Sequence, residues 1–183
     1  KTNLKILLQM EIIICTINHP KYLEDTLYTF KNNINIDLYD CRLLINIDPF
    51  PNNNTETVNE VLEIAEKYCK DVEYRVGDKF TAAAGLRWGI NLLKNDYFFI
   101  LGGGKTLIKM IDISYMKEKL FSDDKVVQIA TLNNNDKYFN YLLLIPCLCK
   151  TSWFKNIYLK YSVDHLEIEY QVRELGILDN KKC

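Results

Sequence analysis

The sequence predicts a three-layer α/β/α domain, Rossmann-like in its organisation, with a mainly parallel central sheet. Short apolar runs of strand length alternate with segments of helical periodicity in the order β-α-β-α-β-α-β. The run at 97–101 is apolar throughout, which is typical of a central strand buried on both faces. A chain of 183 residues, 48% hydrophobic and 26% charged, is expected to form one domain spanning 1–183.

The first strand and helix are predicted from β-branched residues followed by a proline. Met10–Ile17 is rich in β-branched residues, mainly isoleucine, as a buried strand is. Pro20 suits the first turn of a helix, where its missing N–H costs nothing. Apolar residues then recur at helical spacing and predict one buried helix face, made of Leu23, Leu27 and Phe30.

The second unit begins with the apolar run Cys41–Ile47, which predicts another strand. Asp48–Thr55 contains two prolines and three asparagines and is expected to be an irregular loop. Thr57-x-x-Glu60 matches a capping box and predicts the start of a helix. A third strand is expected at Val72–Val76.

The third unit pairs a helix at Ala82–Leu93 with a strand at Tyr97–Leu101. Beyond residue 105 the alternation weakens. We expect strands at Val126–Leu132 and Tyr138–Ile145 and a helix near Val163–Leu175, which would complete the sheet and enclose one side of a site.

Composition excludes several classes of function. The formal net charge is −1, so no general attraction to nucleic acid is expected. No apolar run approaches the roughly 18 residues of a transmembrane span. Six scattered cysteines are more typical of a reducing compartment than of a disulfide framework, which favours a cytoplasmic protein. Cys147 and Cys149 have no second pair at zinc-site spacing.

Polar residues or glycines follow each predicted strand of the first half. In open parallel sheets, ligands bind at the carboxyl ends of the strands. The sequence therefore predicts a binding site made from four groups: Thr16–Asn18, Asp48, Arg75–Asp78 and Gly102–Lys105.

Four motifs in this half occur in a recognisable order. Ile14–Leu23 is similar to T-x-N-R-P-x-x-L, and Leu44–Asp48 is a strand that ends in an acidic residue. Phe80–Gly89 is similar to the helix start N-x-A-A-A-x-N-x-G, and Asp96–Leu101 to the strand D-Y-I-x-x-L. Together they resemble the glycosyltransferase A fold, in particular family-2-like glycosyltransferases, over residues 10 to about 107.

The resemblance implies a hexosyltransferase that uses a nucleoside diphosphate sugar, linked to UDP or GDP, and an unknown acceptor. Residues 1–107 would form the nucleotide-binding half and 108–183 the acceptor-side half. Thr16, Asn18 and Asp48 would hold the nucleoside, while Arg87, which replaces the usual Asn, and Lys105 would face the diphosphate. From the residues alone, Asp48 is equally interpreted as the turn residue that opens its loop.

The triglycine Gly102-Gly103-Gly104 departs from the family pattern. There the strand leads into D-x-D or E-D-D, whose carboxylates hold Mg²⁺ or Mn²⁺ against the diphosphate. Those ligands are missing from this sequence, so no metal site is predicted. Three explanations stay open: a metal-independent transferase with glycine amides or Lys105 at the phosphates, a degenerate binding protein, or acidic residues lost from this copy.

An inverting transferase also needs a carboxylate base to accept the proton of the acceptor hydroxyl. The acidic cluster near residue 165 supplies candidates in Asp164 and Glu167. Their spacing equally matches a capping box, which is a structural explanation for the same residues.

Two other nucleotide-binding patterns fit less well. Gly102–Thr106 resembles a P-loop, but that motif requires a glycine where Phe99 stands. A nucleotidyltransferase on a related sheet would carry a glycine-rich loop near the first strand, and Cys15–Lys21 contains no glycine.

Overall fold

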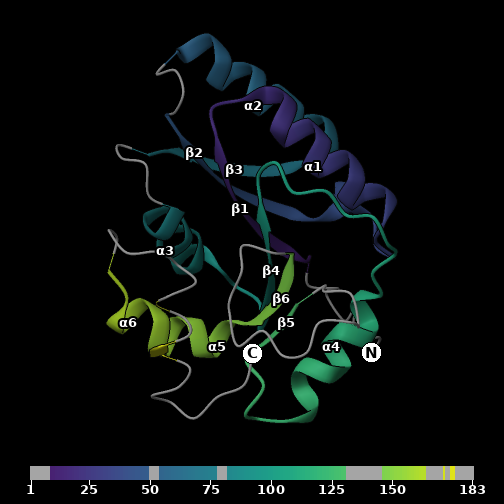
Figure 1. Cartoon of the computed structure of the whole chain (residues 1–183), viewed down its shortest axis with the longest axis vertical. Helices are drawn as coiled ribbons and strands as arrows, with labels where there is room; N and C mark the ends of the chain where they lie inside the picture. The colour runs from purple at the N-terminus through teal and green to yellow at the C-terminus, as the bar shows by residue number, and fades with distance from the viewer. Residues whose placement is uncertain are drawn as a thin grey trace, which may run out of the picture.

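The computed structural model describes residues 9–49, 54–77, 82–130, 146–163, 171, 174 and 175. A six-stranded sheet runs through the molecule in the order β3-β2-β1-β4-β6-β5 (Figure 1). The first four strands pair in parallel, whereas β6 is antiparallel to both β4 and β5. The strands are β1 Glu11–Ile17, β2 Arg42–Asp48, β3 Asp71–Val76, β4 Tyr97–Gly102, β5 Gln128–Ala130 and β6 Cys147–Lys150.

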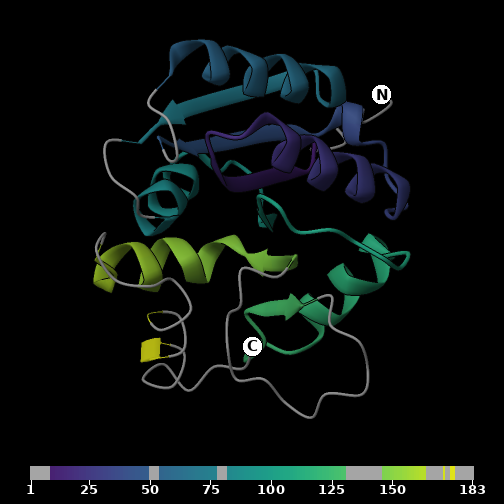
Figure 2. The ribbon, with the colours of Figure 1, turned by 45° about the horizontal axis from the view of Figure 1, so that its top comes forward.

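Helices cover both faces of this sheet. Figures 1 and 2 show α1 and α2 side by side over one face, with α3 and the segment from α5 to α6 over the other. The predicted three-layer α/β architecture with a mainly parallel sheet is confirmed. The helices are α1 Pro20–Asn32, α2 Thr55–Tyr68, α3 Ala82–Leu92, α4 Ile113–Ser122, α5 Thr151–Trp153 and α6 Leu159–Tyr161, with a 3₁₀ turn η1 at Leu38–Asp40 and a π-helical turn η2 at Phe154–Tyr158.

The alternation of side chains along β1 divides the core into two clusters. Ile12 and Ile14 belong to the cluster beneath α1 and α2, whereas Ile13 and Cys15 belong to the cluster beneath α3. The predicted apolar face of α1, made of Leu23, Leu27 and Phe30, is fully buried in the first cluster. Because the central strands are buried on both faces, their sequences are apolar at consecutive positions.

One predicted helix start is wrong. A cap at Thr57 would make Val58 the first residue of α2, but the helix begins three residues earlier, at Thr55. The side chain of Asn54 caps it by accepting a hydrogen bond from Glu56 N over 2.9 Å. Thr57 therefore lies inside the first turn and cannot be the capping residue. Asparagine is at least as good an N-cap as threonine, which is why the helix can begin earlier than the capping box predicts.

The second half of the chain differs more from expectation. The strand predicted at 126–132 is observed as β5, with residues 131 and 132 outside the described residues. The strand predicted at 138–145 and most of the helix predicted at 163–175 also lie outside them. Several observed elements were not predicted. They are the 3₁₀ turn η1, helix α4, the short strand β6, which lies between β4 and β5, and the helical segment formed by α5, η2 and α6.

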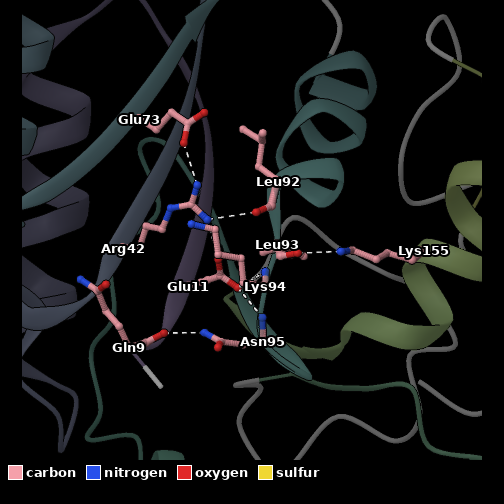
Figure 3. Close-up of polar contacts among 9 residues, drawn as sticks. All are labelled: Gln9, Glu11, Arg42, Glu73, Leu92, Leu93, Lys94, Asn95 and Lys155. Carbon is pink, nitrogen blue, oxygen red and sulfur yellow. Dashed lines mark hydrogen bonds and ion pairs between the residues drawn. The ribbon is translucent and has the colours of Figure 1, made fainter. Parts of the chain in front are cut away.

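An ion-pair network around the buried residues Glu11 and Arg42 holds the strand ends opposite the predicted site. Arg42 Nη1 donates to Glu11 Oε1 over 2.7 Å and to Leu92 O over 3.0 Å, at the end of α3. Its Nη2 donates to Glu73 over 2.7 Å. The second oxygen of Glu11 accepts from the backbone of Lys94 and Asn95 (Figure 3). Three strands and α3 are thereby fixed relative to one another.

The described residues include neither a membrane-spanning helix nor a disulfide. No helix among them combines the length and the apolar character that crossing a membrane would require. Five of the six cysteines are described, and none of these five forms a disulfide.

Candidate functional site

The carboxyl ends of four parallel strands lie next to one another, as the sequence predicts. Asn18 N donates to Asp48 O over 2.8 Å, which joins the ends of β1 and β2. Gly77 N donates to Ile47 O over 2.9 Å and extends the same edge to β3. On the other side, Gly103 N donates to Cys15 O over 3.0 Å and joins β4 to β1. The residues that follow these strands therefore share one edge of the sheet.

Asp48 is a buried carboxylate at this edge, with a relative exposure of 6%. One of its oxygens accepts from Asn46 Nδ2 over 3.0 Å. Burial raises the pKa of Asp48, although the hydrogen bond from Asn46 and the charge of Arg75 act in the opposite direction. A carboxylate held at such a desolvation cost is well suited to accept hydrogen bonds from a ligand's hydroxyl groups.

Asn46 is enclosed by α3. Its side chain is 1% exposed, and among the described residues its Oδ1 has no hydrogen-bond donor. Gly85 of α3 lies against it, and a Cβ at Gly85 would be 2.4 Å from Asn46 Cγ. Only glycine lets the helix come this close, so Gly85 sets the distance between α3 and the Asn46–Asp48 pair.

Two further contacts fix the first turn of α3 on the sheet. Arg75 Nη1 of β3 donates to Ala84 O over 3.4 Å, and Cys15 Sγ donates to Ala82 O over 3.5 Å. Burial, and secondarily the charge of Asp48, raises the pKa of the Cys15 thiol to about 12. Cys15 therefore stays a neutral thiol at physiological pH and is not a nucleophile.

Asn18 is also buried at the strand ends. Its Nδ2 donates to Asn54 O over 3.2 Å, which connects the end of β1 to the residue that caps α2. Its backbone N–H is the one that binds Asp48 O, so the two predicted nucleoside-binding residues are neighbours.

Thr16 faces the opposite side of the sheet from Asp48. It is 3% exposed and lies beneath Gly103, while its hydroxyl donates to Ile17 O over 3.2 Å. The structure therefore brings Asn18 and Asp48 together but places Thr16 under the loop that follows β4. Lys105, in that loop, is exposed.

Arg87 lies on α3 and reaches the second half of the chain. Its Nη1 donates to Leu159 O over 2.9 Å, to Ser162 O over 2.8 Å and to Ser162 Oγ over 2.6 Å. These contacts cap the carboxyl end of α6. A contact between Arg87 and a diphosphate stays a prediction.

Asp164 and Glu167, the predicted catalytic carboxylates, lie outside the described residues. The chain just before them is held by Gln171, whose side chain pairs with both backbone groups of Val163. Gln171 Nε2 donates to Val163 O over 2.9 Å, and Val163 N donates to Gln171 Oε1.

A divalent cation does not fit the end of β4 in the way the resemblance implies. Among the described residues, no group of three His, Cys, Asp or Glu side chains is placed to hold a metal ion. Gly102 ends β4 without a side chain, and Gly103 and Gly104 turn toward α1. In the implied site, carboxylate oxygens hold the cation against the diphosphate, and the three glycines supply none.

Sequence reasoning missed two residues of the site, Asn46 and Gly85. Asn46 had a detectable signal, because it is a polar residue inside an apolar strand and lies two positions before Asp48, on the same face. Gly85 had none beyond being a glycine within a helix, since its role depends on a neighbour 39 positions away (85 minus 46).

Comparisons with known proteins support the fold. No protein-family model matches the sequence, and no curated protein sequence matches it. The mannosyltransferase PcManGT from Pyrobaculum calidifontis, solved with GDP-Man and Mn²⁺, is similar with a TM-score of 0.70 and 10% identity, over 93% of this chain and 52% of that one. S. aureus TarS 1–349 with UDP-GlcNAc is similar with a TM-score of 0.61 and 11% identity, over 92% and 53%.

A nucleotidyl transferase from Methanothermobacter thermautotroptrophicus is similar too, with a TM-score of 0.61 and 10% identity, over 96% of this chain and 85% of that one. The chain spans about half the length of PcManGT and of TarS 1–349. At these identities the likeness concerns the fold. The chain has a fold of the glycosyltransferase A type.

Proposed function

We propose that this chain binds a nucleoside diphosphate sugar, linked to UDP or GDP, at the carboxyl ends of β1 to β4 and transfers its hexose to an acceptor hydroxyl. The observation that supports this most is the buried Asp48, fixed by Asn46 at a shared strand edge. Parallel α/β sheets bind ligands at this edge. The similar structures solved with GDP-Man and UDP-GlcNAc support the class of ligand.

In this proposal the nucleotide-binding half is 1–107. Asp48 accepts hydrogen bonds from ribose hydroxyls or a base, and Asn18 and Thr16 shape the same end of the sheet. Gly102, Gly103 and Gly104 allow the backbone to pass close to the diphosphate, and the exposed Lys105 provides a positive charge there. Arg87 connects this half to the acceptor-side half, 108–183, through Ser162.

The proposed chemistry is a single displacement. Asp164 or Glu167 accepts the proton of the acceptor hydroxyl, whose oxygen forms a bond to the anomeric carbon. The bond from that carbon to the diphosphate oxygen breaks, and UDP or GDP leaves with the electron pair. Lys105 is proposed to offset the charge that develops on the leaving group. The described cysteines form no disulfide, which supports a cytoplasmic setting for this reaction.

Binding and turnover test the proposal separately. Titration calorimetry with UDP, GDP and a panel of their sugar derivatives should give saturable binding to one of the two series. Asp48→Ala should weaken that binding at least tenfold, whereas Glu56→Ala, on the exposed start of α2, should not. Release of UDP or GDP with an acceptor extract would then identify the donor. An absence of binding by every compound would reject the proposal.

A second candidate, which the missing carboxylates at Gly102–Gly104 leave open, is a non-catalytic binding protein on the same fold. It predicts nucleotide binding without release of UDP or GDP. The likeness to a nucleotidyl transferase favours one further assay. Incubation with a nucleoside triphosphate and a sugar phosphate would release pyrophosphate if that chemistry occurs, and neither of the other candidates predicts this product.

A further inference from the structure

The bend after β4 occupies the place where a divalent cation is expected from the resemblance. We infer that this bend is built to pack against β1 and α1 instead of holding a cation, so that a nucleotide bound at these strand ends is bound without a divalent metal. The second part of this inference rests on the proposed function. The first part concerns the packing of the described residues alone.

Gly103 leaves no room for a side chain. A Cβ there would stand 2.2 Å from Thr16 Oγ1, 2.6 Å from Thr16 Cβ and 2.9 Å from Thr16 Cα. Side-chain rotation of Thr16 could relieve the first contact but not the last, because Cα is part of β1. Gly103 is held in this position by its hydrogen bond to Cys15 O. A carboxylate at position 103 would therefore require the bend to move away from the sheet.

Gly104 disfavours a carboxylate for a different reason. Its φ of +79° is a conformation that residues with a Cβ adopt at a cost. A Cβ built there would be 3.7 Å from the ring of Tyr22, which is itself stacked on His19 with ring centroids 4.3 Å apart. A side chain at position 104 would thus start in contact with the ring of Tyr22 and would also carry the strain of a positive φ.

The amide groups of the bend are also engaged. Gly103 N donates to Cys15 O, and Lys105 N donates to Gly102 O over 3.2 Å. Gly104 N donates to Thr26 Oγ1 over 2.9 Å. An anion nest requires successive N–H groups that point at the anion. These three point at acceptors within the chain, so the bend is not arranged as a phosphate nest either.

One face of α1 binds Gly104 and Leu107, which lie in the segment that follows β4. Thr26 Oγ1 holds Gly104, Thr29 Oγ1 accepts from Leu107 N over 3.2 Å, and Asn33 Nδ2 donates to Leu107 O over 3.0 Å. These three helix residues are spaced by three and four positions, so they lie on one face. Each of these three side chains forms a hydrogen bond with a backbone group of Gly104 or Leu107. The polar face of α1 therefore holds the segment after β4 in place.

The experiment measures metal and nucleotide separately on the folded chain. Mn²⁺ is titrated into the wild-type protein, and paramagnetic broadening of the backbone amide signals of Gly102–Gly104 is followed by NMR. UDP and GDP are titrated by calorimetry in EDTA and in MnCl₂. We expect no selective broadening of these amides up to about 1 mM Mn²⁺, a concentration that would reveal even a Kd in the millimolar range. The affinities for nucleotide in EDTA and in MnCl₂ should differ by less than about twofold, which corresponds to about 0.4 kcal/mol.

Variants complete the test. Gly103→Asp and Gly104→Asp should each lower the unfolding midpoint and gain no Mn²⁺ binding. Thr106→Asp is the matched control, because it adds the same charge at an exposed position in the same bend. Should the glycine variants fail to fold, the wild-type Mn²⁺ titration still decides. Selective broadening in the wild type, or Mn²⁺ binding by a glycine variant as stable as Thr106→Asp, would overturn the inference.

Failure of the proposed function gives a different result. If neither UDP nor GDP binds in EDTA or in MnCl₂, the proposed function is wrong. The broadening measurement still tests whether the bend binds Mn²⁺, because it does not depend on a nucleotide. If a nucleotide binds at least tenfold more tightly in MnCl₂ and the same amides broaden, the function stands and the inference is wrong.

Discussion

Glu11 and Arg42 form an ion pair with 2.7 Å between Oε1 and Nη1, and their side chains are only 2% and 10% exposed. The pair lies at the end of the sheet opposite the candidate site. Arg42→Ala would leave the Glu11 charge buried with only backbone donors, because Lys94 N and Asn95 N are its other partners. We expect a loss of about 3–5 kcal/mol in the free energy of unfolding, measured by urea denaturation.

The control for this prediction is a surface ion pair. Lys21 and Asp25 also lie 2.6 Å apart, but both are largely exposed. Lys21→Ala should change stability little, since exposed pairs contribute little. Equal losses in Arg42→Ala and Lys21→Ala would show that burial of the network contributes nothing.

A second prediction concerns the distance between α3 and β2. Gly85→Ala would place a methyl group 2.4 Å from Asn46 Cγ and must push α3 away from the Asn46–Asp48 pair. We expect a loss of about 1–3 kcal/mol in stability and weaker nucleotide binding by calorimetry. Gly89→Ala is the matched control, because its Cβ would meet Ile13 in the core, 2.9 Å from Cδ1. If both variants bind nucleotide equally, Gly85 does not shape the site.

The raised pKa of Asp48 predicts a pH-dependent effect of Asp48→Asn. Because the native-state pKa lies above the unfolded-state value of about 3.9, folding favours the protonated form. The associated stabilisation is complete below the unfolded-state pKa and is lost as the pH rises through the native-state pKa. The stability of Asp48→Asn relative to wild type should therefore increase between pH 4 and pH 7.

Urea unfolding of both proteins across this pH range measures that difference, and other titrating groups cancel because they are common to both. The hydrogen bond from Asn46 can persist, since the amide oxygen of the variant also accepts. Nucleotide binding should nevertheless fall, because an amide is a weaker acceptor than a carboxylate. A constant stability difference from pH 4 to pH 7 would contradict the desolvation of Asp48.

Arg87 is predicted to hold the carboxyl end of α6. Its Nη1 binds two carbonyl oxygens and the Ser162 hydroxyl. Arg87→Ala should raise hydrogen exchange at the backbone amides of residues 159–163 about tenfold, whereas amides of β1 should be unchanged. Asn91→Ala, one turn later on the exposed face of α3, provides the control. Protection equal to wild type would rule out this role.

The candidate site was predictable in part because strand ends are marked locally. Apolar runs show where β1, β2 and β4 end, and parallel pairing then requires Asn18, Asp48 and Gly102 to share an edge. The side of the sheet that each residue faces was also implicit, since side chains alternate along a strand. Thr16 and Asp48 are nevertheless predicted as one nucleoside-binding group, because their positions at strand ends do not show which face of the sheet each side chain occupies.

Local pattern was enough for the alternation of strands and helices up to residue 102, because most of those elements bury an apolar face that their own residues define. The edge strand β3 is the exception, since none of its residues is fully buried. Folding in three dimensions settled the rest. Strand β6 takes its identity from the ladders it forms with β4 and β5, and four residues carry too little periodicity to reveal it. Gly103 packs against Thr16, and Gly104 is hydrogen-bonded to Thr26. Thr16 comes close to Gly103 only when β4 pairs with β1, and Thr26 comes close to Gly104 only when α1 packs on these strands.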